Sequence, residues 1–219
     1  MATASFVEMP RPPRNWVSGA LYHVFSRGSN RGAIFTFDSD RIDFLVCAGR
    51  AFSRHQVECL AYALMPNHHH WLLRLPEADF RLSAAFKELN GRYALRFNRR
   101  YGRDAHLFRN RFRAVLQESE GQLLWTVRYI VMNPVEANLC SDPREYPWSS
   151  HRATLGLERP PPFLDVPLLL SYLGDTTEKA LQRYADLISA PTEKSVSDTG
   201  VEEAPSGPSW RGMAAPAMG

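Results

Sequence analysis

Hydrophobic and polar positions recur along the chain with two different periods. The two-residue period predicts β-strands, and the three- and four-residue spacing of apolar residues predicts helices. The predicted strands cover residues 21–26, 57–65, 68–75 and 113–116, with a short extended piece at 34–37. The predicted helices cover residues 38–55, 80–101 and 119–132, approximately.

Turn and cap residues divide these elements. Asp38 or Ser39 is placed to cap the first helix, and Gly102 to end the second. Ser119, with Gln122 three residues later, forms a capping box at the start of the third. The order strand, helix, hairpin, long helix, strand, helix predicts an α+β domain with a ferredoxin-like antiparallel sheet and helices packed on it.

The 219 residues suffice for one domain with its own core and additional terminal segments. We expect a flexible N-terminal arm at 1–15, the main domain at 16–155, a short helical appendix at 156–189 and a disordered tail at 190–219. Within the appendix, a stiff proline linker at 160–162 precedes helices near 168–173 and 176–187.

Composition excludes several classes of protein. The chain contains no run of about 18 apolar residues, so it predicts no membrane span, and its first twenty residues lack the apolar segment of a secretory signal. Its three cysteines, Cys47, Cys59 and Cys140, are scattered along the sequence. That usage is typical of a reducing cytosol and argues against a disulfide framework or a cysteine zinc site.

Positive charge is concentrated in one part of the chain. The net charge is only +3, yet residues 81–113 hold ten basic residues, nine of them arginine, and two acids. Arginine presents a planar fork of donors that matches phosphate oxygens, so we expect a nucleic-acid surface rather than a solvated helix face. The candidate DNA contacts are Arg92, Arg96, Arg99, Arg103, Arg109, Arg111 and Arg113. An aromatic stripe beside them on the long helix, from Phe86 to Tyr101, is expected to face the core.

Two short motifs supply candidate chemistry. His68 and His70 alternate with His69 along a strand, so the outer two face the same side and are placed to hold one divalent cation. Tyr129 and Asn133 are four residues apart on a helix and share one face, and an amide oxygen suits Mg²⁺ or Mn²⁺. Taken singly, an H-x-H pair is more often two surface histidines, and a lone tyrosine is far more often a core aromatic.

In combination the segments resemble a known family. LYHVFSRGSNR, ALMPNHHHWLL, GRYALRFNRRYGRDAHLFRNRFRAVL, RYIVMNPVEANL and YPWSSHRATLG follow one another as in the single-tyrosine HUH transposases, and most closely as in the REP-associated tyrosine transposase branch of bacteria. The resemblance covers roughly residues 16–189. The pairing of M-P-N-H-x-H with a later Y-I-x-x-N-P-V is far more specific than either motif alone.

The resemblance implies a metal-dependent transposase that cuts single-stranded DNA beside hairpin-forming palindromes. It implies that Tyr129 is the nucleophile, forming a 5′-phosphotyrosine, and that His68, His70 and Asn133 hold Mg²⁺ or Mn²⁺. Single-stranded or hairpin DNA is then the partner of a cytoplasmic monomer or homodimer. The alternative is a domesticated hairpin-DNA-binding protein without strand transfer. A water-using metal nuclease is a further possibility.

Two features depart from the family pattern. The residue between the two motif histidines is usually apolar, and here it is His69, which we expect to lie on the opposite face of the strand, neutral in the core or near water. Ala105 and Asn110 stand where the family often has glycine, which changes the expected geometry of that loop.

Overall fold

The computed structural model describes residues 15–77 and 81–190. Its strands are β1 (Leu21–Arg27), β2 (Glu58–Met65), β3 (His68–Arg74) and β4 (Arg113–Leu116). Its α-helices are α1 (Asp38–Arg54), α2 (Leu82–Tyr101), α3 (Glu120–Glu136), α4 (His151–Thr154), α5 (Val166–Ser171) and α6 (Thr177–Ser189). Two 3₁₀ turns complete the list, η1 (Ser29–Arg31) and η2 (Pro143–Glu145). The predicted arm, apart from residue 15, and the predicted tail, apart from residue 190, lie outside the described residues.

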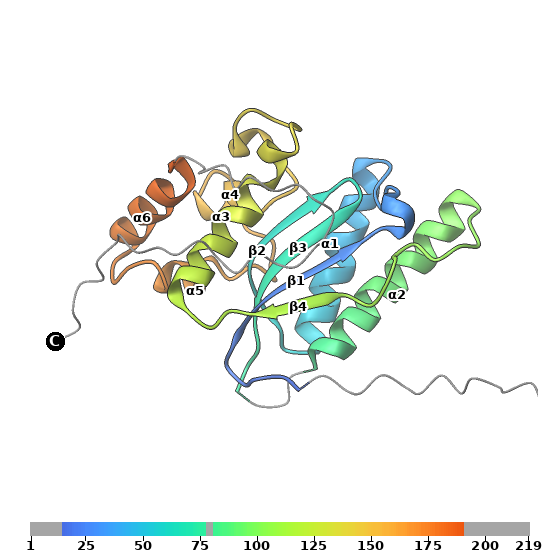
Figure 1. Cartoon of the computed structure of the whole chain (residues 1–219), viewed down its shortest axis with the longest axis horizontal. Helices are drawn as coiled ribbons and strands as arrows, with labels where there is room; N and C mark the ends of the chain where they lie inside the picture. The colour runs from blue at the N-terminus through green and yellow to red at the C-terminus, as the bar shows by residue number, and fades with distance from the viewer. Residues whose placement is uncertain (1–14, 78–80, 191–219) are drawn as a thin grey trace, which may run out of the picture.

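The four strands form one antiparallel sheet in the order β2-β3-β1-β4. With α1 between β1 and β2 and α2 between β3 and β4, this is the ferredoxin-like arrangement, which confirms the predicted fold class. Helices α1 and α2 lie on one side of the sheet, and α3, α5 and α6 lie on the other (Figure 1).

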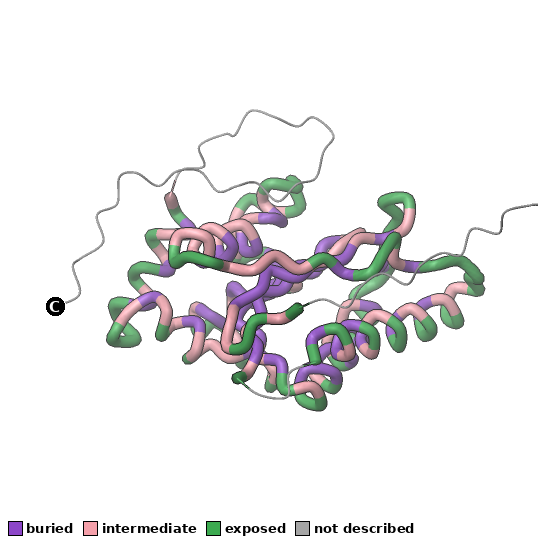
Figure 2. Tube along the Cα trace, turned by 60° about the horizontal axis from the view of Figure 1, so that its bottom comes forward, coloured by how far each residue is buried: buried purple, intermediate pink, exposed green. Residues whose placement is uncertain are grey.

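Strand alternation builds a separate core on each side of the sheet. On the α1/α2 side, Val24, Trp71 and Leu73 pack against the buried face of α2, including Phe86 and Tyr93. The expected aromatic stripe of α2 is therefore confirmed as core. On the other side, Leu60 and Leu72 are among the strand residues that pack with α3, α5 and α6. Many of the buried residues lie on the central strands of the sheet (Figure 2).

Two local predictions are wrong. Residues 34–37 form no strand. Instead the backbone N–H groups of Ile34 and Phe35 both donate to the carbonyl of Pro66 in the β2–β3 turn, at 2.9 and 3.2 Å, which ties this loop down outside the sheet. Helix α3 does not end at Met132 but continues through Pro134 to Glu136. Asn133 and Pro134 are both buried, and their packing overrides the tendency of a residue before proline to leave the helical region.

The remaining boundaries agree with the sequence to within a few residues. The predicted start of the long helix near Phe80 lies outside the described residues, and α2 begins at Leu82. Helices α5 and α6 cover the regions expected to be helical near 168–173 and 176–187. No helix among residues 15–77 and 81–190 has both the length and the apolar composition that crossing a membrane requires.

Candidate active site

The candidate site lies on the face of the sheet that is covered by α3. Along β3, His70 stands opposite Phe25 of β1, and His68 stands opposite Arg27. The rings of His68 and His70 are neighbours, with centroids 4.9 Å apart. His69 instead contacts Phe44 and Phe86 in the core on the other side. The pair therefore shares one face, as strand alternation predicts.

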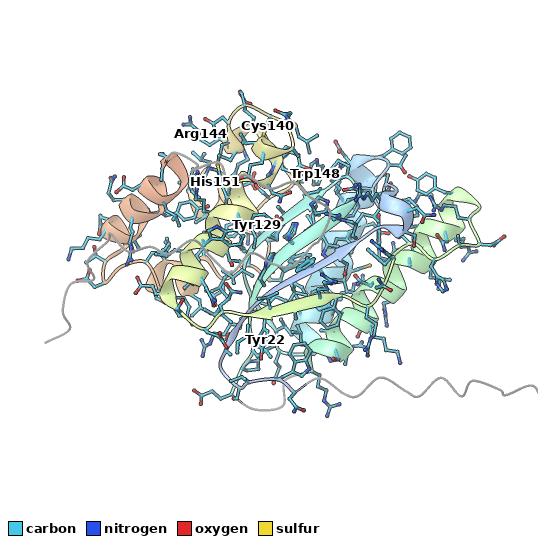
Figure 3. All side chains as sticks on the ribbon, in the orientation of Figure 1. Tyr22, Tyr129, Cys140, Arg144, Trp148 and His151 are labelled. Atoms are coloured by element: carbon cyan, nitrogen blue, oxygen red, sulfur yellow. The ribbon has the colours of Figure 1, made fainter. Side chains whose placement is uncertain are left out.

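Tyr129 projects from α3 onto these histidines. Its ring centroid lies 5.2 Å from that of His70, with the two rings nearly perpendicular. Trp125, one helical turn earlier, stacks on the other side of Tyr129 at 5.0 Å with an interplanar angle of 11°. Figure 3 shows Tyr129 on α3, beside the strands. The tyrosine and the histidines that it contacts belong to the same chain, and the stack with Trp125 restricts how Tyr129 can rotate.

His68 lies between two amide oxygens. Its Nδ1 is 2.7 Å from Asn67 Oδ1, and its Nε2 is 3.3 Å from Asn133 Oδ1. A neutral imidazole has one N–H, and the shorter contact favours Nδ1–H as the donor. In that tautomer, His68 Nε2 and Asn133 Oδ1 are neighbouring atoms that both carry a lone pair and no proton. Two ligands of a shared cation have this arrangement.

The second imidazole also fits a cation. His70 Nε2 is buried and has no hydrogen-bond partner among the described residues. Within residues 15–77 and 81–190, no group of three or more His, Cys, Asp and Glu side chains is arranged to hold a metal. The third predicted ligand is an amide, Asn133, whose Oδ1 lies 3.3 Å from His68 Nε2.

Burial keeps His23 and His70 neutral. Desolvation lowers the pKa of His23, on β1, to about 4. Desolvation also lowers the pKa of His70 well below its ordinary value, and the neighbouring His23 and His68 lower it further. Both rings are uncharged at pH 7, which is the form in which imidazole binds a metal.

His69 lies in the core, which is one of the two placements expected from the sequence. It is fully buried, and desolvation lowers its pKa to about 3. The indole N–H of Trp71 donates to His69 Nδ1 at 2.7 Å. A polar residue therefore replaces the usual apolar one without leaving the buried indole donor unpaired.

The predicted DNA-binding arginines are all exposed, but they divide between the two sides of the sheet. On the α1/α2 side, Arg92 pairs with Glu88 at 3.3 Å, and Arg96 pairs with Asp43 of α1 at 2.6 Å. Arg113, on β4, is paired with Phe25 of β1, and Phe25 is paired with His70 of β3. Paired residues point to the same face of a sheet, so Arg113 and His70 share a face. The other four, on α2 and the loop that follows it, are Arg99, Arg103, Arg109 and Arg111.

Sequence reasoning missed three residues of this face, namely His23, Arg27 and Trp125. His23 Nε2 lies 2.9 Å from His70 Nδ1. Trp125 carries a signal in the sequence, because it precedes Tyr129 by four residues on the same helix. His23 and Arg27 are four residues apart on β1 and therefore lie on the same face of the strand. Their nearness to the histidine motif depends on the pairing of β1 with β3.

Arg128 has a different role from its neighbour Tyr129. It is the preceding residue on the helix and points away from Tyr129, because successive side chains are about 100° apart. Its guanidinium donates to the carbonyls of Leu187, Ile188 and Ala190 at 3.2, 2.6 and 2.7 Å. It therefore fastens the end of α6 to α3.

Comparison with known proteins assigns the family. A search of curated proteins finds no match. Among solved structures, the chain resembles a REP-associated tyrosine transposase bound to a REP hairpin, with a TM-score of 0.57 and 18% identity over 72% of this chain and 92% of that one. It also matches the crystal structure of a proposed transposase from Deinococcus radiodurans R1, with a TM-score of 0.40 and 17% identity over 55% of this chain and 95% of that one. The family model "Transposase IS200 like" matches residues 16–139, more than half of the chain, so this protein belongs to the IS200-like transposase family and is a DNA-cleaving and DNA-joining enzyme by kind.

Proposed function

We propose that this chain cleaves and rejoins single-stranded DNA beside hairpins, with Tyr129 as the nucleophile. The observation that supports this most directly is the contact of Tyr129 with His70 in the same chain, beside the facing atoms of His68 and Asn133. In the proposed step the phenolic oxygen bonds to phosphorus, and the bond from phosphorus to the 3′ oxygen of the preceding nucleotide breaks. The phenol loses its proton and the departing oxygen gains one. The products are a 5′-phosphotyrosine and a free 3′-OH.

His68, His70 and Asn133 would hold a Mg²⁺ or Mn²⁺ ion. When bound, the ion would supply Lewis-acid stabilisation of the charge that develops on the phosphate oxygens. The chain itself contributes orientation. The stack of Trp125 on Tyr129 and the bond from His68 to Asn67 hold the nucleophile and one imidazole before DNA arrives. Such preorganisation lowers the entropic cost of reaching an in-line geometry.

The DNA partner is proposed as a hairpin with a single-stranded flank. The fold resembles a transposase bound to a REP hairpin, and we extend that partner class, and the REP-associated branch, to this chain. Arg113 on the site face is best placed for the strand at Tyr129. The loop at 103–112 approaches the same end of the sheet, because the Arg109 N–H donates to the Arg27 carbonyl at 2.9 Å. Arg92 and Arg96, on the other side, would contact only a duplex that reaches around the domain.

The assembly and the location of the protein follow from the proposed activity. Tyr129 contacts the histidines of its own chain, which favours a site that is complete in a monomer, although a homodimer of two such sites is equally compatible with this contact. A protein acting on chromosomal palindromes works in the cytoplasm. We also propose that the main domain spans residues 16–155 and that residues 156–189 form a helical appendix to it.

The experiment is a search for the covalent adduct on hairpin oligonucleotides taken from palindromes that flank the gene. A 5′-phosphotyrosine retains the downstream fragment, so a 3′ label should migrate with the protein on a denaturing gel and a 5′ label should not. The adduct should need Mg²⁺ or Mn²⁺ and disappear with a chelator. A 5′-labelled adduct would reverse the proposed polarity.

Variants separate the candidate functions. Tyr129→Phe should abolish the adduct while hairpin affinity stays within a few-fold. Tyr172→Phe is the matched control, because it removes a hydroxyl from a residue packed in the same core and should leave the adduct unchanged. Cleavage without an adduct would indicate a water-using nuclease. Hairpin binding without cleavage under any metal would indicate the domesticated DNA-binding protein.

A further inference from the structure

We propose that His23 is a positioning residue for the metal site, because it accepts a hydrogen bond from the Nδ1–H of His70 and so keeps the His70 Nε2 lone pair available. This inference rests on the proposed function, in which His70 is a ligand. It assigns a role to a β1 residue that lies outside both motifs.

The contact is direct and secluded from solvent. His23 Nε2 and His70 Nδ1 are 2.9 Å apart, and the two residues are 5% and 4% exposed. His23 also contacts the ring of Tyr129, with centroids 5.7 Å apart. It therefore touches both a proposed ligand and the proposed nucleophile. Its Nε2 is occupied by His70, so it is placed as a partner of the ligand and not as a further ligand.

Proton counting gives the bond its direction. Burial disfavours the charged form of either ring, so each imidazole carries one N–H. If His23 donated to His70 Nδ1, the proton of His70 would sit on Nε2. That N–H would then be a buried donor without a hydrogen-bond partner in the described part of the chain. If His70 donates, Nε2 carries a lone pair that faces the site, and only this arrangement permits coordination.

Hydrogen bonds of this kind orient metal-binding histidines and fix their tautomer, and losing one weakens metal binding about 10- to 100-fold. In many sites the partner is a carboxylate or a carbonyl oxygen. Here a neutral ring nitrogen takes that place, which adds no negative charge where a DNA phosphate must bind.

The first test uses the unmodified, metal-free protein. Long-range ¹H–¹⁵N correlation spectra of the ¹⁵N-labelled full chain report which ring nitrogen of each histidine is protonated. We expect His70 to be protonated at Nδ1 and His23 to accept at Nε2. A His70 ring protonated mainly at Nε2 would overturn the inference, and this outcome does not depend on any variant folding.

The second test measures Mn²⁺ binding without DNA, by the loss of the free-Mn²⁺ electron paramagnetic resonance signal. His23→Leu should weaken binding about 10- to 100-fold. His23→Gln, whose side-chain oxygen can replace Nε2 as the acceptor, should stay within about threefold of the parent protein. The control is His151→Gln, which alters another buried histidine, one that is bonded to Tyr184 of α6, and should bind like the parent.

The two proposals fail in different ways. If the parent protein binds no Mn²⁺, or if His68→Ala binds as well as the parent, the proposed metal site is wrong. If the parent binds Mn²⁺ through His68 and His70 and His23→Leu binds equally well, the metal site stands and the role assigned to His23 is wrong.

Discussion

Replacing Arg128 with methionine tests how α6 is fastened to α3, the helix that carries Tyr129. Two of the three bonds from Arg128 to the end of α6 are short, at 2.6 and 2.7 Å, and the third is 3.2 Å. A hydrogen bond to a charged group contributes about 1.5–3 kcal/mol. Arg128 is partly exposed, so we take the lower value for the two short bonds and a smaller one for the third. Arg128→Met, which keeps most of the aliphatic stem, should therefore lower the free energy of unfolding by about 3–4 kcal/mol.

Urea denaturation followed by circular dichroism measures this change. The matched control is Arg183→Met, because Arg183 also joins α6 to α3 through an ion pair with Glu120, but both of its charged groups are largely exposed. An exposed pair contributes about 1 kcal/mol or less. Amide hydrogen exchange should show faster opening of α6 in Arg128→Met than in Arg183→Met. Equal destabilisation of the two variants would refute the reasoning that buried carbonyl contacts, rather than surface charge, fasten α6.

Three further predictions concern separate parts of the molecule. Arg113→Gln should weaken single-strand binding and reduce the salt slope by about 0.7, whereas Arg92→Gln, paired on the other side of the sheet, should change neither in a fluorescence-anisotropy titration. His69→Leu should cost about 1–3 kcal/mol of unfolding free energy in urea, because a buried indole donor loses its acceptor. Burial lowers the pKa of His151 to about 4, below its unfolded value near 6.5. The unfolded state therefore binds more protons between these two values, and the stability of the folded state decreases as the pH is lowered through this range. His151→Asn, which keeps an acceptor for the Tyr184 hydroxyl, should therefore lose about 2 kcal/mol less than the parent protein between pH 7 and pH 5.

Local sequence patterns were sufficient for most of the fold. The periods of two and 3.6 residues placed the four strands and the three long helices, because each of these elements buries one face against the sheet or a helix. They failed where tertiary contacts decide. Ile34 and Phe35 have strand-like composition, but their N–H groups bond to the β2–β3 turn and not to a strand. The proline rule ended α3 too early, because burial of Pro134 holds the last turn.

In the candidate site, too, local sequence patterns placed some residues, and others depend on tertiary contacts. His68 and His70 are two residues apart and Tyr129 and Asn133 four, so each pair could be placed on one face from local geometry alone. That His68 faces Asn133 is a tertiary contact, and it was expected from the family resemblance. His23 could not be found in this way. Its partner is 47 residues away in the sequence, and no motif joins β1 to β3 before their register is known.

The register that builds the core also selects the chemistry. On β3, His69 and Trp71 face the α1/α2 core, and His68 and His70 face α3, where His70 contacts Tyr129 and His68 contacts Asn133. A slip of one residue would exchange the two faces, bringing His69 toward Tyr129 and burying His70 in the aromatic core. The contacts of Trp71 with Phe44 and Phe52 in the α1/α2 core resist that slip, since the indole would leave both rings. The three consecutive histidines are thus not interchangeable: the packing of Trp71 and its neighbours determines which two of them face α3 and Tyr129.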